Sequence, residues 1–250
     1  GTWGSRCMIM SGGAVAAACD ELADRILRIG AGLLQARRED VRIENGEVVG
    51  PSGRIGVAEV ARTWYRRPQD LPPDLNPGGL ELTGGYKAKR DTGTFSYAAH
   101  AAVVAVDPET GEVEILDYVI VEDGGVLVNP MIVDGQVFGG TAQGIGTALY
   151  EEMPYDAQGQ PLASTLSDYM LPGPTEVPEI RILHMETPSP YTRFGQKGIG
   201  EGGAIAPPAA IANAVNDAVR GLGAELLVSP ITPRRIAEAI ERTRPRTVAA

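Results

Sequence analysis

The chain begins with a segment of helical periodicity. Its apolar residues recur every three to four positions, at Val15, Ala18, Leu22, Ile26 and Ile29. This spacing places them on one face of a helix, which we expect to start at about residue 11 with Ser11 as its N-cap. The start of this helix either offers backbone N–H groups to an anion or is a capped surface turn, and the residues alone leave both interpretations open.

Two shorter elements follow the predicted helix. Residues 41–49 alternate in polarity around Asn45-Gly46, a dipeptide typical of a two-residue β-hairpin. Residues 55–66 have the apolar spacing of a short helix. Residues 67–79 are rich in Pro, Asp and Asn, which predicts a loop that crosses the surface.

The second part of the chain contains strand-like patterns. Residues 97–106 and 112–122 are rich in β-forming residues, and the turn sequence of residues 107–111 separates them, so we expect a long antiparallel hairpin. His100 and His184 fall in predicted strands, where a lone histidine is usually a packing or hydrogen-bonding residue. Further strands are expected at residues 164–170, 180–185 and 225–228.

Three helices are also expected in the second part, each with proline in its first turn, where the missing N–H costs little. Asn129 and Thr232 are suitable N-caps for two of them. The helices are predicted over about residues 130–150, 205–219 and 233–243, and residues 244–250 are expected to fray.

The predicted 130–150 helix contains more glycine than helical stability favours, at Gly135, Gly139, Gly140, Gly144 and Gly146. Each costs about 1 kcal/mol relative to alanine in a helix interior. On spacing alone, close packing against another element is the favoured explanation. The alternative is close approach of a ligand to Gln143, whose amide can both donate and accept hydrogen bonds.

Helices alternate with hairpins in this order of elements, without a regular β-α-β-α succession. The order predicts an α+β fold with helices packed on mixed or antiparallel sheets. We divide the chain into three parts. Residues 1–66 hold an opening loop, a helix and a hairpin; residues 67–79 form a linker; and residues 80–250 form an α+β region that carries a glycine-rich loop.

The composition is that of an ordinary globular protein, with 43% hydrophobic and 22% charged residues in a chain of 250. The net charge of −10 argues against a nucleic-acid-binding surface. No apolar run approaches the roughly 20 residues of a membrane helix, and no signal peptide is recognisable. The compartment is not encoded in these features, and we expect a cytoplasmic location, with the periplasm as the alternative.

Cysteine and histidine are scarce. Cys7 and Cys19 are too few for a disulfide scaffold, or for holding an iron–sulfur cluster alone. His100 and His184 show no zinc-site spacing. Any redox centre must therefore be held largely by something other than this chain. Because the chain starts at Gly1 in what we interpret as an ordered loop, we expect a processed, split or trimmed polypeptide.

The most informative segment is a glycine-rich loop, Phe194-Gly195-Gln196-Lys197-Gly198-Ile199-Gly200-Glu201-Gly202-Gly203. Glycine lets a backbone approach a ligand closely, so we expect the loop to present Glu201 to bound chemistry. Three interpretations compete: a dinucleotide-binding fingerprint, a solvated structural crossing, and a catalytic loop whose carboxylate acts as a general base. The fingerprint lacks a strand running directly into the loop, and Glu201 would occupy the place of a pyrophosphate.

The loop resembles the K-G-x-G-E motif of the molybdenum hydroxylases, the family of xanthine dehydrogenase, aldehyde oxidase and carbon monoxide dehydrogenase. Gly1-Thr2-Trp3-Gly4-Ser5-Arg6 resembles the G-T-x-G-S-R segment of their molybdopterin-binding subunit. Asp123-Gly124-Gly125, Asn129-Pro130 and Gln143-Gly144-Ile145-Gly146 also resemble the family in order and spacing. The resemblance covers nearly the whole chain apart from residues 67–79. It identifies the chain as the C-terminal part of the large subunit.

The resemblance implies that Glu201 is catalytic. In the family, the glutamate of this motif deprotonates a Mo–OH group, whose oxygen attacks an electrophilic carbon of the substrate. We therefore expect part of a molybdopterin-dependent oxidoreductase that hydroxylates an aldehyde or an N-heteroaromatic compound with a water-derived oxygen. The alternatives are a non-catalytic assembly subunit of such a complex and a nucleotide-binding module.

The resemblance also implies a molybdenum–pterin cofactor, in the molybdopterin cytosine dinucleotide form. The opening segment would wrap the pterin and its phosphate, and Gln143 would hydrogen-bond the pterin. Cys7 stands where the family usually has a small hydroxyl residue, and no residue is expected to bind the metal directly. The expected cofactor-binding residues are Gly4, Ser5, Arg6, Cys7, Gln143, Lys197, Gly198 and Gly200.

Partner chains follow from the same resemblance. They are the N-terminal portion of the large subunit as a separate chain, an iron–sulfur subunit with 2Fe-2S clusters, and a flavin subunit with FAD. The expected enzyme is active only with these partners. The family's substrate-selecting loops lie outside this chain, so the sequence does not identify the substrate.

Overall fold

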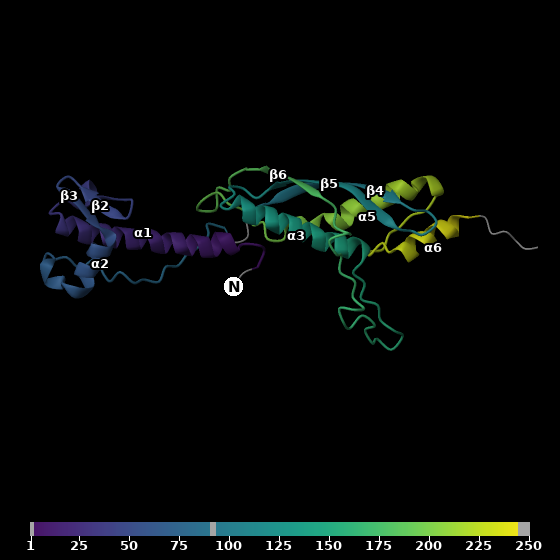
Figure 1. Ribbon diagram of the computed structural model, residues 1–250, viewed down its shortest axis with the longest axis horizontal. Helices are drawn as coiled ribbons and strands as arrows, with labels where there is room; N and C mark the ends of the chain where they lie inside the picture. Colours follow the sequence, from purple (N-terminus) through teal and green to yellow (C-terminus); the bar gives the residue numbers. More distant parts are fainter. Residues whose placement is uncertain (1–2, 91–93, 245–250) are drawn as a thin grey trace, which may run out of the picture. The chain divides into compact units, whose positions relative to one another are not determined.

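The computed structural model describes residues 3–90 and 94–244 (Figure 1). The chain divides into two compact units: Met10–Ala88 forms the first, and Gly1–Ile9 together with Lys89–Ala250 forms the second. The sequence pattern predicts divisions after residues 66 and 79. The observed boundaries differ because the expected linker packs into the first unit, where Leu71 is buried and Leu75 packs against the same core.

Most of helix α1 (Cys7–Leu33) belongs to the first unit, together with helix α2 (Val57–Arg66). A three-stranded antiparallel sheet completes it, formed by β1 (Arg42–Glu44), β2 (Glu47–Gly50) and β3 (Gly53–Gly56) in that order. Short 3-10 helices lie at Arg38–Asp40 and Pro68–Asp70. The predicted hairpin and short helix are thus confirmed, whereas β3 was missed.

Local chemistry explains the first unit. Asn45 and Gly46 both have positive φ, at 50° and 77°, as the tight hairpin turn requires. Helix α1 packs on β2 so closely that a Cβ on Gly30 would lie 2.8 Å from the side chain of Val48. The predicted N-cap at Ser11 was wrong because α1 already begins at Cys7, directly after Gly4 and Ser5 take positive φ.

The second unit is built on a mixed sheet of order β4-β5-β6. Strands β4 (Tyr97–Val106) and β5 (Val113–Asp123) form the predicted antiparallel hairpin, and β6 (Ile180–Met185) pairs with β5 in parallel. Together with the helices and the sheet of the first unit, this arrangement confirms the predicted α+β class.

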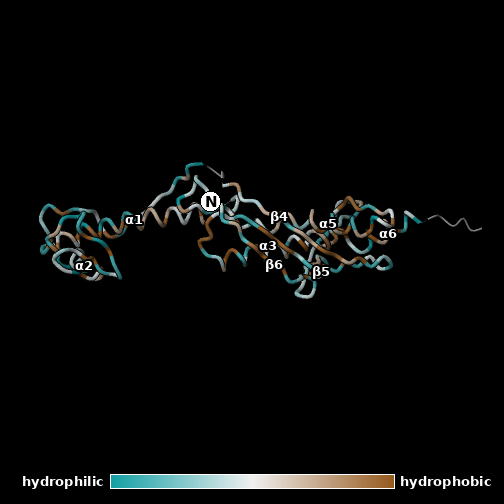
Figure 2. The backbone as a smooth tube through the Cα atoms, turned by 90° about the horizontal axis from the view of Figure 1, so that it is seen from above, coloured by the Kyte–Doolittle hydropathy of each residue, from teal (hydrophilic) through white to brown (hydrophobic). Residues whose placement is uncertain are grey.

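Three main helices pack with this sheet, α3 (Pro130–Leu149), α5 (Pro207–Val219) and α6 (Pro233–Thr243). Their buried residues form one hydrophobic core with Tyr118 and Ile120 of β5, and Figure 2 shows hydrophobic stretches, in brown, along these elements. Asn129 and Thr232 accept hydrogen bonds from the first turns of α3 and α6, which confirms both N-caps. In the part of the chain that the structure describes, no helix is both long enough and apolar enough to span a bilayer.

The predicted 205–219 helix is divided in two. A short helix, α4 (Gly202–Ile205), precedes α5, and Ala206 separates them. Pro207 and Pro208 lack backbone N–H groups, so a continuous helix could not form its hydrogen bonds across this point. A short 3-10 helix, Arg220–Leu222, follows α5. Of the predicted frayed end, only Arg244 lies within the described residues.

Two predicted strands are absent from the described structure. At residues 164–170, the Thr165 hydroxyl instead donates to Asp168 at 2.9 Å and accepts from the Ser167 N–H, which makes a turn. This turn belongs to a long irregular loop between α3 and β6 that projects from the unit (Figure 1). At residues 225–228, the Asn216 side chain bonds both the N–H and the carbonyl of Leu226, so these groups need no partner strand.

Close packing explains three of the five glycines in α3, Gly140, Gly144 and Gly146, and a Cβ on Gly146 would lie 3.0 Å from the Pro172 ring. A Cβ on Gly140 would lie 3.0 Å from the Ala204 nitrogen of α4, and one on Gly144 would lie 2.7 Å from the Pro207 ring of α5. By contrast, a Cβ on Gly139 would meet nothing within 4 Å.

We therefore expect Gly144→Ala to lower the free energy of unfolding by about 1–2 kcal/mol, because overpacking outweighs the gain in helix propensity. Gly139→Ala on the same helix is the matched control, and we expect it to be neutral or to stabilise by up to about 1 kcal/mol. Denaturant unfolding of the two variants measures both effects. Equal stabilities would show that Gly144 is not needed for this packing.

Candidate cofactor and catalytic site

The glycine-rich loop lies in the second unit, where it is attached to the end of β5. The Val126 N–H donates to the Gly195 carbonyl at 3.1 Å, and the Lys197 N–H donates to the Gly124 carbonyl at 2.8 Å. Gly125 has a φ of 66°, and a Cβ there would lie only 2.3 Å from the Gly195 oxygen. Glycine is therefore required where these two segments cross.

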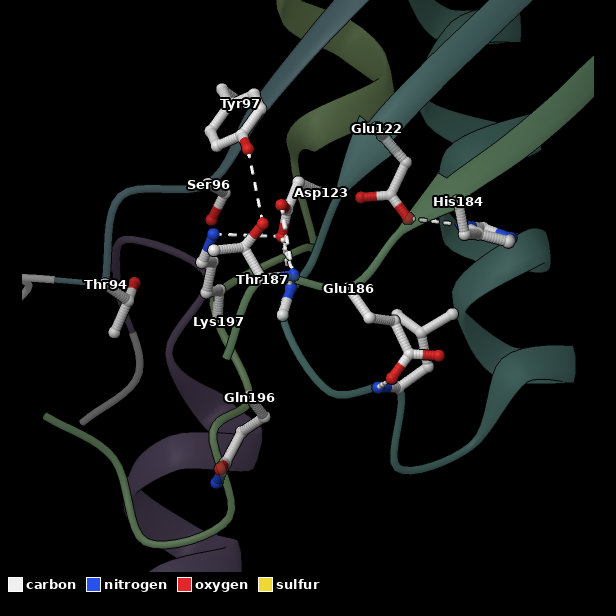
Figure 3. A network of polar contacts seen from close by, with 12 residues as sticks. Thr94, Ser96, Tyr97, Glu122, Asp123, His184, Glu186, Thr187, Gln196 and Lys197 are labelled. Carbon is white, nitrogen blue, oxygen red and sulfur yellow. Dashed lines mark hydrogen bonds and ion pairs between the residues drawn. The ribbon is translucent and has the colours of Figure 1, made fainter. Parts of the chain in front are cut away.

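A buried ion pair fixes the loop. The Lys197 ammonium lies 2.9 Å from Asp123 Oδ1, and the two side chains are 5% and 0% exposed (Figure 3). Asp123 also accepts hydrogen bonds from the backbone N–H groups of Gly125 and Thr187. Burial by itself raises the pKa of Asp123, but the hydrogen bonds from Thr187 and Lys197 outweigh it and hold the pKa well below its usual range.

The charged end of Lys197 is therefore engaged inside the protein. It lies 4.9 Å from the centre of the Tyr97 ring as well as beside Asp123. Among the predicted cofactor-binding residues, Lys197 thus anchors the loop from within. Lys197 does not line the cavity beside Gly198 and Glu201.

The catalytic candidate, Glu201, is held by a residue from the other end of the sequence. The Ser5 hydroxyl donates to Glu201 Oε2 at 2.7 Å and accepts from the Glu201 N–H at 3.0 Å, across 196 positions of sequence. Ser5 reaches this position because Gly4 and Ser5 both adopt left-handed backbone conformations, with φ of 59° and 56°. The structure therefore brings together two residues that the sequence singled out separately.

The backbone of the opening segment also touches the glycine loop. A Cβ on Gly198 would lie 3.0 Å from the carbonyl oxygens of both Gly4 and Ser5. Two contacts that sequence analysis missed complete this arrangement. The Ser96 hydroxyl donates to the Gly198 carbonyl, and the Gln136 amide donates to the Gly200 carbonyl at 3.1 Å.

A cavity of about 520 Å³ opens beside these contacts. Four of the predicted site residues line it, along with Ser96 and Glu122, which no motif had indicated. These six lining residues are Gly4, Ser5, Ser96, Glu122, Gly198 and Glu201.

The other predicted contacts lie elsewhere. Arg6 is buried, with its guanidinium carbon 3.8 Å from the centre of the Trp3 ring. Cys7 is an exposed free thiol at the start of α1. Gln143 is exposed on α3, two helical turns beyond Gln136 and hence on a similar face of the helix. None of the three lines the cavity.

One feature of the cavity wall is a chain of three titratable groups. Glu122 of β5 contacts His184 Nδ1 at 2.5 Å, and His184 Nε2 contacts Asp134 of α3 at 2.6 Å. Burial raises the pKa of Glu122 even though His184 acts in the opposite direction. The pKa of His184 is also raised, because its hydrogen bonds to the two carboxylates outweigh the effect of burial.

Both histidines were expected to be structural. His100 lies 3.1 Å from the Tyr118 hydroxyl inside the sheet, and burial lowers the pKa of His100. His184 instead connects residues of two other elements. No sequence pattern indicated this link, because its members lie on β5, α3 and β6.

The site has the donor chemistry of an organic-cofactor site. Its lining combines backbone brought close by glycine, a hydroxyl and carboxyl groups. Over residues 3–90 and 94–244, no group of three His, Cys, Asp or Glu side chains is placed to hold a metal ion. A metal here would need a ligand other than these side chains, and a pterin-bound metal meets that condition.

Fold and site together define a cofactor-binding domain in which Ser5 holds the Glu201 carboxylate at a cavity lined in part by glycine backbone. Comparison with known proteins identifies the class: residues 1–178 match the molybdopterin cofactor-binding domain. The chain belongs to this family, within the large subunits of the molybdenum hydroxylases. The resemblance found in the sequence is therefore confirmed.

Individual relatives support the assignment. The chain is 39% identical to the nicotine 6-hydroxylase large subunit of Paenarthrobacter nicotinovorans, over 96% of this chain and 29% of the relative. It is 34% identical to the 6-hydroxypseudooxynicotine dehydrogenase complex subunit gamma of the same organism, over 94% and 30%. The crystal structure of quinoline 2-oxidoreductase from Pseudomonas putida 86 matches with a TM-score of 0.85 and 39% identity, over 98% and 31%. The chain thus spans about 30% of the length of these relatives.

Proposed function

We propose that this chain forms the part of a molybdenum hydroxylase large subunit that supplies the catalytic base, Glu201. The observation that carries the proposal is the pair of hydrogen bonds between the Ser5 hydroxyl and Glu201, one given to the carboxylate and one accepted from the N–H, which hold Glu201 at the cavity. The reaction is hydroxylation of a substrate carbon with oxygen derived from water. The alternative is a role limited to assembly of the complex, which would not explain why Ser5 holds the Glu201 carboxylate at the cavity.

The residues present fit a molybdenum–pterin cofactor, proposed here in its cytosine dinucleotide form. Gly4, Ser5 and Gly198 would hold it through backbone and hydroxyl groups at the cavity, and Gln143, which is exposed on α3, would add a side-chain amide for hydrogen bonding. When bound, the cofactor supplies a metal that activates a water-derived oxygen and accepts two electrons.

Glu201 would take up a proton in this reaction. Ser5 occupies Oε2 of the carboxylate, and Oε1 has no partner among the described residues. One oxygen therefore fixes the orientation of the carboxylate, while the other can receive the proton that activation of the oxygen releases. Lys197, paired with Asp123, would keep the loop in the shape that makes this possible.

The names of the relatives favour an N-heteroaromatic substrate over an aldehyde. Nicotine and quinoline, after which two of them are named, both contain a nitrogen heteroaromatic ring. Ring nitrogen makes the adjacent carbon electrophilic, which suits attack by an activated oxygen. We extend this substrate class to the protein as a proposal.

Partner chains belong to the same proposal. The first relative is named as a large subunit and the second as a subunit of a complex. We propose that the complex contains the N-terminal portion of the large subunit, an iron–sulfur subunit with 2Fe-2S clusters and a flavin subunit with FAD. These centres would carry away the two electrons of each turnover.

Analysis of the natively purified complex tests the proposed function. We expect molybdenum and pterin in the complex, and turnover of N-heteroaromatic compounds with incorporation of oxygen from labelled water. A complex with neither molybdenum nor turnover would support the assembly role. Turnover of aldehydes alone would refute the proposed substrate class but not the enzyme class.

Loss of the Ser5 hydroxyl should weaken the positioning of Glu201. We expect Ser5→Ala to lower kcat by about 10- to 100-fold, because misplacement of a catalytic group has effects of this size. Ser52→Ala is the matched control, since Ser52 is also a hydroxyl donor, to the Leu34 carbonyl, but belongs to the first unit. Equal kcat values for the two variants would contradict the positioning by Ser5.

A further inference from the structure

The cavity contains a second carboxyl group whose chemistry the proposed function does not use. Glu122 is 2% exposed, and its Oε2 is a buried oxygen without a hydrogen-bond partner among the described residues. Buried carboxyl oxygens are normally paired, since an unpaired one is costly. Glu122 also lines the cavity. In Figure 3, one of its oxygens is directed at His184 while the other points away from it.

The other carboxyl oxygen of Glu122, Oε1, begins a series of contacts that ends at an exposed side chain. Oε1 lies 2.5 Å from His184 Nδ1, and His184 Nε2 lies 2.6 Å from Asp134 Oδ1. Exposure increases along this series, from 2% for the Glu122 side chain to 20% for His184 and 55% for Asp134. The three groups therefore connect the cavity wall to solvent through two short contacts.

We propose that Glu122, His184 and Asp134 form a proton path that carries protons from the cavity to solvent. This inference rests on the proposed function. Hydroxylation converts a C–H group and water into a C–OH group, two protons and two electrons. The electrons leave through the iron–sulfur centres of the partner chains, and each proton given to Glu201 must leave the cavity before the next turnover.

The path can move one proton without net change in its own charge. In the resting state, Glu122 Oε1–H donates to Nδ1 of neutral His184, and Nε2–H donates to Asp134. When a donor in the cavity gives a proton to Oε2, the Oε1 proton passes to Nδ1. The Nε2 proton then passes to Asp134 and from there to water. The resting state returns when His184, which now carries its proton on Nδ1, loses that proton to water and takes one from water on Nε2, and the new carboxyl proton rotates from Oε2 to Oε1.

The charged surroundings are consistent with this resting state. The groups that act on Glu122 are His184 from β6, Asp134 from α3 and its neighbour Asp123 on β5, and both aspartates favour a protonated Glu122. Its partner on β4, Ala98, carries no charge. Asp123 is itself neutralised by Lys197. A proton shared between Glu122 and His184 is thus favoured at this position.

Proton release during a single turnover of the complex tests the path. A pH-indicator dye reports the protons, and the absorbance of the redox centres reports the electrons, for wild type and for His184→Ala with a quinoline-type substrate. We expect His184→Ala to delay proton release behind electron transfer by about 10-fold or more. Added imidazole should restore the wild-type rate, since it can occupy the space between Glu122 and Asp134.

Asp117→Asn is the matched control. Asp117 is also a β5 carboxylate paired with a basic side chain of β6, Arg181, at 2.5 Å, but it does not line the cavity. We expect this variant to release protons at the wild-type rate. Wild-type proton release in His184→Ala, or a delay that imidazole does not restore, would overturn the path.

Infrared spectroscopy supplies a readout that does not depend on turnover. We expect a carbonyl band of a protonated carboxylic acid in the wild-type complex that is missing in Glu122→Gln, and its absence from wild type would overturn the path. A wild-type complex that shows the band but does not hydroxylate any heteroaromatic compound would count against the proposed function. In that case Glu122 would still be protonated, but its proposed role in proton transfer during hydroxylation would be rejected.

Discussion

Glu201→Gln is expected to lower turnover of the complex by about 10²- to 10⁴-fold, the range typical of losing a general base. Glutamine has the same shape, and its amide oxygen can still accept the hydrogen bond from Ser5 that Glu201 Oε2 accepts at 2.7 Å. The amide cannot take up a proton under these conditions. The substitution therefore removes the proposed chemistry while keeping the contact that positions the side chain. Steady-state kcat, together with the molybdenum and pterin content of the same sample, measures the effect.

Glu225→Gln is the matched control for this experiment. Glu225 is an exposed carboxylate that follows α5 and does not line the cavity. We expect it to keep the wild-type kcat. If Glu201→Gln retained its molybdenum and turned over at the wild-type rate, Glu201 would not be the base. Loss of molybdenum from this variant would instead indicate that Glu201 holds the cofactor.

Lys197→Met is expected to destabilise the protein by about 3–5 kcal/mol. The substitution leaves Asp123, which is 0% exposed, without its cation, and breaking a buried ion pair on one side has a cost of this size. In a protein of this length the midpoint of thermal unfolding should fall by roughly 6–20 °C. Because Lys197 anchors the loop that carries Glu201, kcat should fall as well.

The double variant Lys197→Met/Asp123→Asn separates the charge from the packing. Removing both partners avoids an unpaired buried charge, so we expect the double variant to be more stable than Lys197→Met alone. A double variant as unstable as the single one would show that packing of the lysine stem, rather than its charge, holds the loop.

The same ion pair gives a dependence of stability on pH. Asp123 has a pKa below its usual range in the folded protein. Its contribution to stability is therefore fully present above the ordinary carboxyl pKa of about 4 and is lost as the pH falls toward the folded value. We expect thermal midpoints of wild type to decrease below about pH 4, and the double variant to lose less over the same interval.

Much of the secondary structure could be predicted because its determinants are local. Asn45-Gly46 requires a tight turn, and Asn129 and Thr232 cap the helices that follow them, whatever the rest of the chain does. The wrong strand predictions arose where contacts with other parts of the structure determine the local conformation. Leu226 bonds to a side chain of α5 instead of a strand, and residues 164–170 turn back on themselves.

The candidate site shows the same division. The sequence selected Ser5 and Glu201 through the motifs around them, but it contained no sign that the two form a hydrogen bond. Lys197 was selected as a cofactor contact, whereas its ammonium lies inside the protein on Asp123. Glu122 and Ser96 belong to no motif, and Gln136, although its segment resembles the family, was not selected as a site residue, so only their positions in space connect them to the cavity and the loop.

The sequence by itself determined the family, the α+β class and the loop that presents Glu201, because glycine positions and capping residues act over a few neighbours in the chain. The tertiary structure alone decided which side chains meet at the cavity. Hydrogen bonds and ion pairs act over about 3 Å in space, whereas Ser5 and Glu201 are 196 residues apart in the sequence. The link from Glu122 through His184 to Asp134 likewise exists only because β5, β6 and α3 pack side by side.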